Sequence, residues 1–179
     1  MREVTGSDKV NLVGHSQGGL HIKTYTQMYG SPEHVAHAVA IGGNFHGTTL
    51  NGMGTVLAKV IAAMPNFARF MASSAGIQQV VGAEFIEHLN ALPDTAPGPL
   101  YTSIYSPADV TVTPNSSSML AAVDGADVVN IDLGELCGAQ PQHPDLPRDP
   151  MVMSQVLFGL TREAGQEADS STCVEPVRG

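Results

Sequence analysis

The stretch Val-Asn-Leu-Val-Gly-His-Ser-Gln-Gly-Gly, residues Val10 to Gly19, decides the fold of this chain. Its first four residues are a short apolar run, typical of a buried strand, and the segment from Gly18 to Tyr29 is helix-like. The residues between them, 14–18, fit the pattern G-x-S-x-G, in which a serine occupies a sharp turn from strand to helix. We therefore expect Ser16 to be a nucleophile, presented by a turn made of Gly14, His15 and Gly18.

The steric reason for the two glycines is that the residues two before and two after the serine must be small, or the backbones collide. The alternative is a glycine-rich loop of a nucleotide-binding domain. That interpretation fails because no G-x-x-x-x-G-K-[ST] follows, and Gly14-His15-Ser16 is not G-x-G.

Short apolar runs alternate with helix-like segments along the rest of the chain. This alternation predicts an α/β fold with a mostly parallel sheet and flanking helices. The segment from Thr49 to Pro97 is too long for an ordinary connection and is expected to be a helical cap insertion. Residues 1–161 would then form one partial domain, followed by a polar tail, 162–179, that only Cys173 could hold. The further expected strands are Val35 to Ile41, Leu100 to Tyr105 and Ala126 to Ile131; a last helix is expected from Pro150 to Leu160; and apolar residues at helical spacing in the insertion are Leu57, Val60, Ile61 and Met64, then Val80, Val81, Phe85, Ile86 and Leu89.

Composition limits the partners that the protein can have. Among its 179 residues, 8 Lys and Arg stand against 17 Asp and Glu, so the net charge at pH 7 is −9. Such a chain repels phosphates, which argues against nucleic acid and anionic membranes as partners. There is no apolar run of about 18 residues and no apolar stretch at the N-terminus, so we expect no transmembrane segment and no signal peptide within this chain.

A serine nucleophile needs a base to take its proton and an acid to orient that base. In the α/β-hydrolase order of nucleophile, acid and histidine, the acid follows a later strand. Asp109 follows the expected strand Leu100 to Tyr105 directly, although an aspartate in such a position can also simply cap a turn. Asp132, at the end of the fourth expected strand, is the next candidate.

The base must follow the acid in the chain, and His143 is the one histidine that does so, in a loop before the last helix. His15 is expected to point the wrong way in the turn. Among the others, His21, His34 and His37 precede the acid and lie in expected helix or strand, and His88 lies in the insertion. His34 and His37 could hold a metal at spacing i, i+3, but no third ligand is evident, so we expect neither a metal site nor a cofactor. The residue directly after the nucleophile, Gln17, would give its backbone N–H to the oxyanion. Cys137 and Cys173 allow one intramolecular pairing and form no CxxC motif, which leaves paired and unpaired thiols both open.

Four segments together carry a resemblance: Lys9 to Gly19, Asn44 to Leu50, Gly82 to Phe85 and Ser106 to Pro114. They resemble the secreted bacterial triacylglycerol lipases and esterases of the α/β-hydrolase superfamily, of the class 2 lipase type. The resemblance implies Ser16 as nucleophile, Asp109 as acid and His143 as base, acting on carboxylic esters of apolar acids, lipids included, through an acyl-enzyme. It also implies a disulfide between Cys137 and Cys173 and an extracellular location. His46 matches a position near the mouth of the site, with no chemical role assigned.

The same resemblance implies that the chain is the C-terminal part of a longer α/β-hydrolase domain. In this family the strand that carries the nucleophile is about the fifth, and the loop after the third strand gives a second N–H to the oxyanion hole. A chain without that loop would lack this donor, and loss of one such donor costs about 10²–10³ in rate. An inactive truncated fragment is therefore one alternative to a lipase or esterase. The other is a different acyl cleavage by the same fold, of thioesters, lactones or amides, because the triad does not determine which acyl compound is cleaved.

Overall fold

The computed structural model describes residues 2–52 and 74–173 of the chain. Its centre is a sheet of four strands in the order β1-β2-β3-β4, and every neighbouring pair is parallel. The strands are β1 (Val10–His15), β2 (Val35–Ile41), β3 (Leu100–Tyr105) and β4 (Asp127–Asp132), and the α-helices are α1 (Arg2–Thr5), α2 (Gln17–Thr24), α5 (Ser74–Ile77), α6 (Glu84–Asn90), α7 (Leu133–Cys137) and α8 (Pro150–Thr161).

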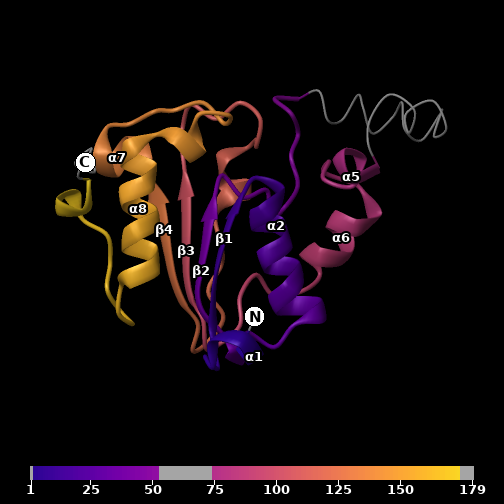
Figure 1. Cartoon of the computed structure of the whole chain (residues 1–179). Helices are drawn as coiled ribbons and strands as arrows, with labels where there is room; N and C mark the ends of the chain where they lie inside the picture. Colours follow the sequence, from indigo (N-terminus) through magenta and orange to yellow (C-terminus); the bar gives the residue numbers. More distant parts are fainter. Residues whose placement is uncertain (1, 53–73, 174–179) are drawn as a thin grey trace.

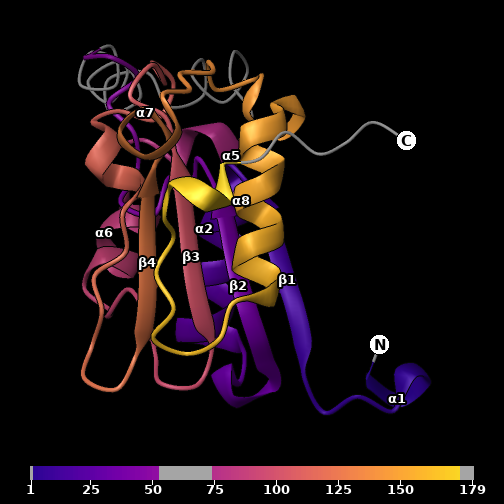
Figure 2. The same cartoon turned by 90° about the vertical axis from the view of Figure 1, so that its left-hand side faces the viewer.

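The helices cover both faces of the sheet. In Figure 1, α8 lies on one side of the strands, and α2, with α5 and α6 beyond it, lies on the other. Figure 2 shows α1 apart from the other helices, below the lower end of β1. Parallel strands that are joined by crossing helices expose the carboxyl ends of all strands at one edge. The loops that follow β1, β2 and β3 therefore meet at the upper edge of the sheet in Figure 1.

Strand β2 shows how the sequence builds the two layers of core. Side chains of a strand alternate between the faces of the sheet. Val39 and Ile41 join the cluster under α8, whereas Ala38 and Ala40 join the cluster on the side of α2. The small side chains on the second face let α2 approach closely, since a Cβ on Gly19 would lie 2.8 Å from the Cα of Gly43 and 3.2 Å from the Cβ of Ala40.

The strand predictions hold with small shifts. β2 and β3 have the predicted bounds, and β4 lies one residue later than expected. β1 continues past the expected end because Gly14 and His15 still pair with Ala40 and Ile41. The helix after the turn at Ser16 begins at Gln17 and continues into a wider π-helical turn, Tyr25–Tyr29.

Only part of the helix that was expected around Val80 to Leu89 of the cap insertion forms. Val80 was predicted to be helical, but it forms a parallel bridge with Thr48, and the helix α6 begins only at Glu84. The other predicted helix of the insertion, around Leu57 to Met64, lies outside the described residues. Ile86 and Leu89 of α6 pack with Leu20 of α2 in one buried cluster.

The expectation that only Cys173 could hold the tail is wrong. Arg162 is buried, and its guanidinium donates to the backbone oxygen of Tyr101 at 2.9 Å and to Asp127 Oδ1 at 2.6 Å. Asp127 Oδ2 accepts a second bond, from the backbone N–H of Gly165 at 2.7 Å. A buried cation must be paired and hydrogen-bonded, so the start of the tail is fixed against the sheet. A disulfide between Cys137 and Cys173 holds its far end.

None of the helices in residues 2–52 and 74–173 is long and apolar enough to cross a bilayer.

Candidate active site

Ser16 lies in a strained turn between β1 and α2. Its φ is 56° and its ψ is −119°, a conformation that non-glycine residues rarely adopt. Two backbone hydrogen bonds hold it there: the N–H of Ser16 donates to the oxygen of Ile41 at 2.9 Å, and the oxygen of Ser16 accepts from the N–H of Gly19 at 2.9 Å. Backbone strain of this kind costs about 1–3 kcal/mol and persists only where the surroundings enforce it. The turn raises the serine hydroxyl above the edge of the sheet.

The two glycines of the turn do not share one steric role. A Cβ on Gly14 would lie 2.4 Å from the carbonyl carbon of Gly18, so the turn closes only without a side chain there. A Cβ on Gly18 would meet nothing within 4 Å among the described residues. The expectation that Gly18 must be small is therefore wrong. The close approach is between the Cβ position of Gly14 and the backbone of Gly18, and it restricts only Gly14.

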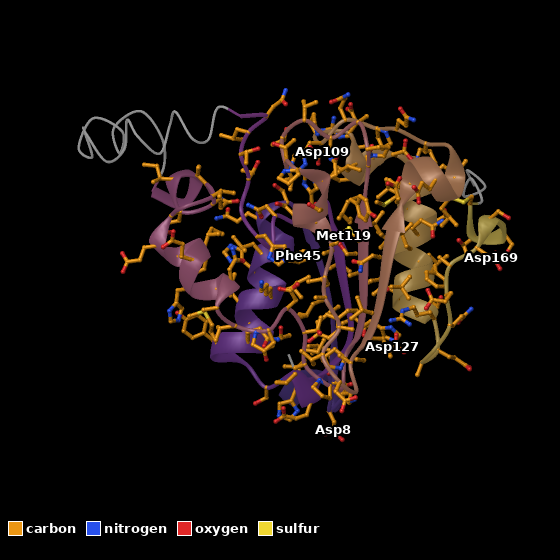
Figure 3. The ribbon with its side chains drawn as sticks, turned by 180° about the vertical axis from the view of Figure 1, so that it is seen from behind. Asp8, Phe45, Asp109, Met119, Asp127 and Asp169 are labelled. Atoms are coloured by element: carbon orange, nitrogen blue, oxygen red, sulfur yellow. A yellow bond between two sulfur atoms is a disulfide. The ribbon has the colours of Figure 1, made fainter. Side chains whose placement is uncertain are left out.

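Asp109 stands on the loop that follows β3, at the upper end of the sheet (Figure 3). Its Oδ1 accepts the backbone N–H groups of Thr111 at 2.7 Å and Val112 at 3.0 Å. The side-chain amide of Asn115 closes the loop from the other side by donating to the backbone oxygens of Ser106 and Asp109. The carboxylate thus does organise a turn, as an aspartate there can, but this uses only one oxygen.

His143 joins the other two predicted residues. Its Nδ1 donates to Asp109 Oδ2 at 2.6 Å, and its Nε2 accepts from the hydroxyl of Ser16 at 2.9 Å. Because an ionised carboxylate only accepts, the first bond places the ring proton on Nδ1 and leaves Nε2 free to take a proton. The three residues predicted from the sequence as nucleophile, acid and base are therefore brought into one chain of hydrogen bonds. Their catalytic roles stay predictions.

The carboxylate of Asp109 is held ionised. Burial raises the pKa of Asp109, but the hydrogen bond from His143 and the backbone bonds from Val112 and Thr111 outweigh it, so the pKa lies below the ordinary value. A charged carboxylate behind the ring stabilises the imidazolium that forms when Nε2 takes a proton. The next candidate for the acid, Asp132, does a different job: it caps α7, accepting from the N–H groups of Gly134 and Glu135.

Gln17 is the first residue of α2, directly after the serine. The first N–H groups of a helix have no partner within it, and the helix dipole makes this end positive. This is the place where a negatively charged oxygen, formed on an acyl group that Ser16 attacks, would find a donor. The assignment of Gln17 as an oxyanion donor remains a prediction.

His15 lies against His143. Its Nε2 meets the backbone oxygen of His143 at 3.1 Å, not the hydroxyl of Ser16, so it does not replace His143. The two imidazole centroids are 4.8 Å apart. Sequence reasoning placed His15 in the turn but missed this contact. Of the pair considered for a metal, His37 bonds through Nδ1 to the oxygen of Gly159, and the described part of the chain holds no cluster of three or more candidate metal ligands.

A buried charge cluster on the α2 side was not foreseen. Lys23 of α2 has no exposed side-chain surface and donates to Asp94 at 2.6 Å. His46 stands 3.2 Å from the other oxygen of Asp94, and its Nδ1 meets the amide oxygen of Asn90. The hydrogen bond to Asp94 raises the pKa of His46. Burial raises the pKa of Asp94, but the hydrogen bonds from His46 and Lys23 outweigh burial, so this pKa lies below its ordinary range. The sign of this cluster in the sequence was the position of Lys23, between Ile22 and Thr24.

Comparisons with known proteins agree with this geometry at the level of the fold. The family model of the alpha/beta hydrolase fold matches residues 1–79, which contain β1, the turn at Ser16 and β2. No curated protein matched the chain. The four parallel strands with helices on both faces are an α/β architecture, and the part of the chain up to residue 79 is similar to the alpha/beta hydrolase fold.

Solved structures of hydrolases are similar at low identity. An α/β hydrolase enzyme from the metagenome of sediments of the Mar Chica lagoon, Morocco, is 20% identical, with 88% of this chain and 63% of that chain covered and a TM-score of 0.45. A structure from the thaumarchaeon Nitrososphaera gargenis, described with its carboxylesterases, is 14% identical, with 89% and 66% covered and a TM-score of 0.46. A Pseudomonas aeruginosa hydrolase is 12% identical, with 90% and 68% covered and a TM-score of 0.45. The chain thus spans about two thirds of the length of these structures.

Proposed function

We propose that the protein is a serine hydrolase that cleaves carboxylic esters, with Ser16 as nucleophile, His143 as general base and acid, and Asp109 as the acid that orients the ring. The observation that carries this proposal is the bridging position of His143, 2.6 Å from Asp109 and 2.9 Å from Ser16. A hydroxyl becomes a useful nucleophile only when a base of this kind takes its proton.

The reaction follows from these contacts. Nε2 of His143 takes the proton of Ser16 as Oγ attacks the ester carbonyl, and the N–H of Gln17 donates to the oxygen that becomes negative. The imidazolium returns its proton to the departing alkoxide, so an alcohol leaves and an acyl-serine remains. Nε2 then takes a proton from water, whose oxygen attacks the acyl group, and the acid is released with the hydroxyl of Ser16 restored.

The proposed substrates are esters of apolar acids, as in lipases and esterases of the class 2 lipase type. The support is the set of sequence segments that resembles those enzymes, together with the apolar residues in the sequence of the insertion. Packing on α2 accounts for Ile86 and Leu89, which belong to a buried cluster with Leu20. The proposal therefore does not assign these two residues to an acyl-binding wall.

We further propose that residues 1–161 are part of an α/β-hydrolase domain, that the cap insertion is about residues 49–97, and that the protein works outside the cell. The disulfide between Cys137 and Cys173 supports the location, because such bonds persist in oxidising compartments. A maleimide reagent should label neither cysteine in protein taken from its native host until a reductant is added. Labelling before reduction would argue against an extracellular location.

The experiment that tests the function compares the protein with two variants, on p-nitrophenyl esters of increasing chain length and with a fluorophosphonate probe. Ser16→Ala should abolish both hydrolysis and labelling, whereas Ser7→Ala, a serine on the exposed segment before β1, should leave both unchanged. Equal rates for Ser16→Ala and the wild type would refute the assignment. Thioesters, amides and lactones of the preferred acyl group, assayed side by side, separate an esterase from the other acyl cleavages, and a wild-type chain that the probe does not label would favour the inactive fragment.

A further inference from the structure

His15 gives His143 two contacts that the proposed mechanism does not use. Nε2–H of His15 donates to the backbone oxygen of His143 at 3.1 Å, and the two rings lie with centroids 4.8 Å apart and planes inclined by 35°. Because a carbonyl oxygen only accepts, the bond also fixes the tautomer of His15, with its proton on Nε2. His15 is the last residue of β1, so these contacts tie His143 to the sheet.

The position of His143 needs such a tie. Ser16 and Asp109 follow directly from strands of the sheet, whereas His143 lies on the irregular segment between α7 and α8. The bonds at Nδ1 and Nε2 hold the two ends of the ring, but both act on the side chain and neither fixes the backbone of the loop. Leu146, which is fully buried, anchors the loop to the core on its other side. On the side of the serine, the bond from His15 is the anchor that acts on the backbone of residue 143 itself.

We propose that His15 is a positioning residue for His143: it holds the backbone and one face of the ring of the base, so that Nε2 stays within reach of the hydroxyl of Ser16. This role rests on the proposed function, since it concerns the proton transfer of ester hydrolysis. Displacement of a reacting group by about 1 Å can lower a rate by about 100-fold, so an anchor of this kind has a kinetic effect without touching the substrate.

The charge state of His15 agrees with this role. Burial lowers the pKa of His15, and repulsion from His143 lowers it further, against smaller opposing effects of the bond to the oxygen of His143 and of Asp109. The lowered pKa favours the uncharged form of His15. It can support the base without placing a second positive charge beside the imidazolium that forms during the reaction.

Three substitutions separate the contacts of His15. His15→Phe keeps a ring and loses the donor, His15→Gln keeps an N–H donor and loses the ring, and His15→Ala loses both. His21→Gln, on the exposed side of α2, is the matched control. The rates are expressed per active site titrated with a fluorophosphonate, so that loss of folded protein does not count as loss of catalysis.

We expect His15→Phe to lower kcat about 10-fold, the effect of one hydrogen bond on a rate, and to leave KM within about twofold. His15→Ala should lower kcat up to about 100-fold, and His15→Gln should recover part of that loss. In proton NMR, the Nδ1 proton that His143 shares with Asp109 should shift or broaden in His15→Ala and remain unchanged in His21→Gln.

The outcomes separate this inference from the proposed function. If the wild type hydrolyses esters through Ser16, while His15→Ala retains kcat within about twofold and an unchanged Nδ1 resonance, the positioning role is refuted. If the wild type hydrolyses no ester, the proposed function fails, and the resonance alone decides whether His15 positions His143.

Discussion

Replacing Asp109 by asparagine separates the two roles of this carboxylate. The new amide oxygen can keep the position of Oδ1 and accept from Thr111 and Val112, at present 2.7 and 3.0 Å away, so the loop keeps its shape. The amide nitrogen then takes the place of Oδ2, which stands 2.6 Å from Nδ1 of His143. Two N–H donors cannot face each other at that distance. The ring must therefore move its proton from Nδ1 to Nε2.

This change of tautomer sets the size of the effect. With its proton on Nε2, His143 cannot accept the proton of Ser16, and the carboxylate that stabilises the imidazolium is also gone. The same exchange in a Ser-His-Asp protease lowers kcat about 10⁴-fold. That factor corresponds to about 5 kcal/mol of lost transition-state stabilisation. We expect a loss of this size in Asp109→Asn, with a small change in KM.

The matched control is Asp132→Asn. Asp132 also uses one carboxylate oxygen to accept two backbone N–H groups, those of Gly134 and Glu135, but it contacts neither His143 nor Ser16 in the described structure. Steady-state hydrolysis of a p-nitrophenyl ester measures both variants, and thermal unfolding shows that both are folded. Equal kcat values for Asp109→Asn and Asp132→Asn would show that the carboxylate of Asp109 organises a turn and nothing more.

Two further predictions concern the turn and the buried charges. Gly14→Ala should abolish labelling by a fluorophosphonate, because its Cβ would lie 2.4 Å from the carbonyl carbon of Gly18. Gly18→Ala should fold, and its free energy of unfolding in urea should rise by up to about 1 kcal/mol, because alanine favours a helix. Equal behaviour of the two variants would contradict the steric argument. Asp94→Asn should lower the free energy of unfolding near pH 5 by about 3–5 kcal/mol, since Lys23 would stay buried without a counter-charge. In the wild type, Asp94 contributes to the free energy of unfolding above its ordinary pKa of 3.8, and this contribution is lost as the pH falls through its lowered pKa. His46 contributes below its ordinary pKa of 6.5, and its contribution is lost as the pH rises through its raised pKa. Urea titrations across this pH range should show both losses of stability in the wild type and neither in the variant.

The parts of this molecule that could be predicted are those that local sequence determines. A strand such as Val35 to Ile41 shows its β-branched and small apolar residues directly, and the turn at Ser16 shows its glycines. Asp109 and His143 followed from chain order, because parallel strands deliver their following loops to one edge of the sheet. None of these steps needed a contact between distant segments to be known in advance.

What could not be predicted depends on such contacts. Arg162 looked like the first residue of a loose polar tail, but it is buried because the acceptors that surround it come from β3 and β4, far away in the chain. Lys23 lies on a helix whose sequence does not show that Asp94 will stand beside it. A buried charge is tolerated only with its partner, and the partner is known only once the chain is folded.

The order of the strands explains why the imidazole between Ser16 and Asp109 comes from neither of the strands that these two residues follow. Ser16 follows β1 and Asp109 follows β3, and β2 lies between them, so the two side chains start about 10 Å apart, two strand spacings. A hydroxyl and a carboxylate cannot meet across that gap, but an imidazole with a hydrogen bond at each nitrogen spans it. The ring must then lie over the end of β2, where the chain continues with Gly42. A Cβ on Gly42 would stand 2.8 Å from Cδ1 of Leu146 and 3.3 Å from Nδ1 of His143. The φ of Gly42, +52°, also favours glycine, so the residue directly after β2 leaves room for a ring that connects Ser16 and Asp109.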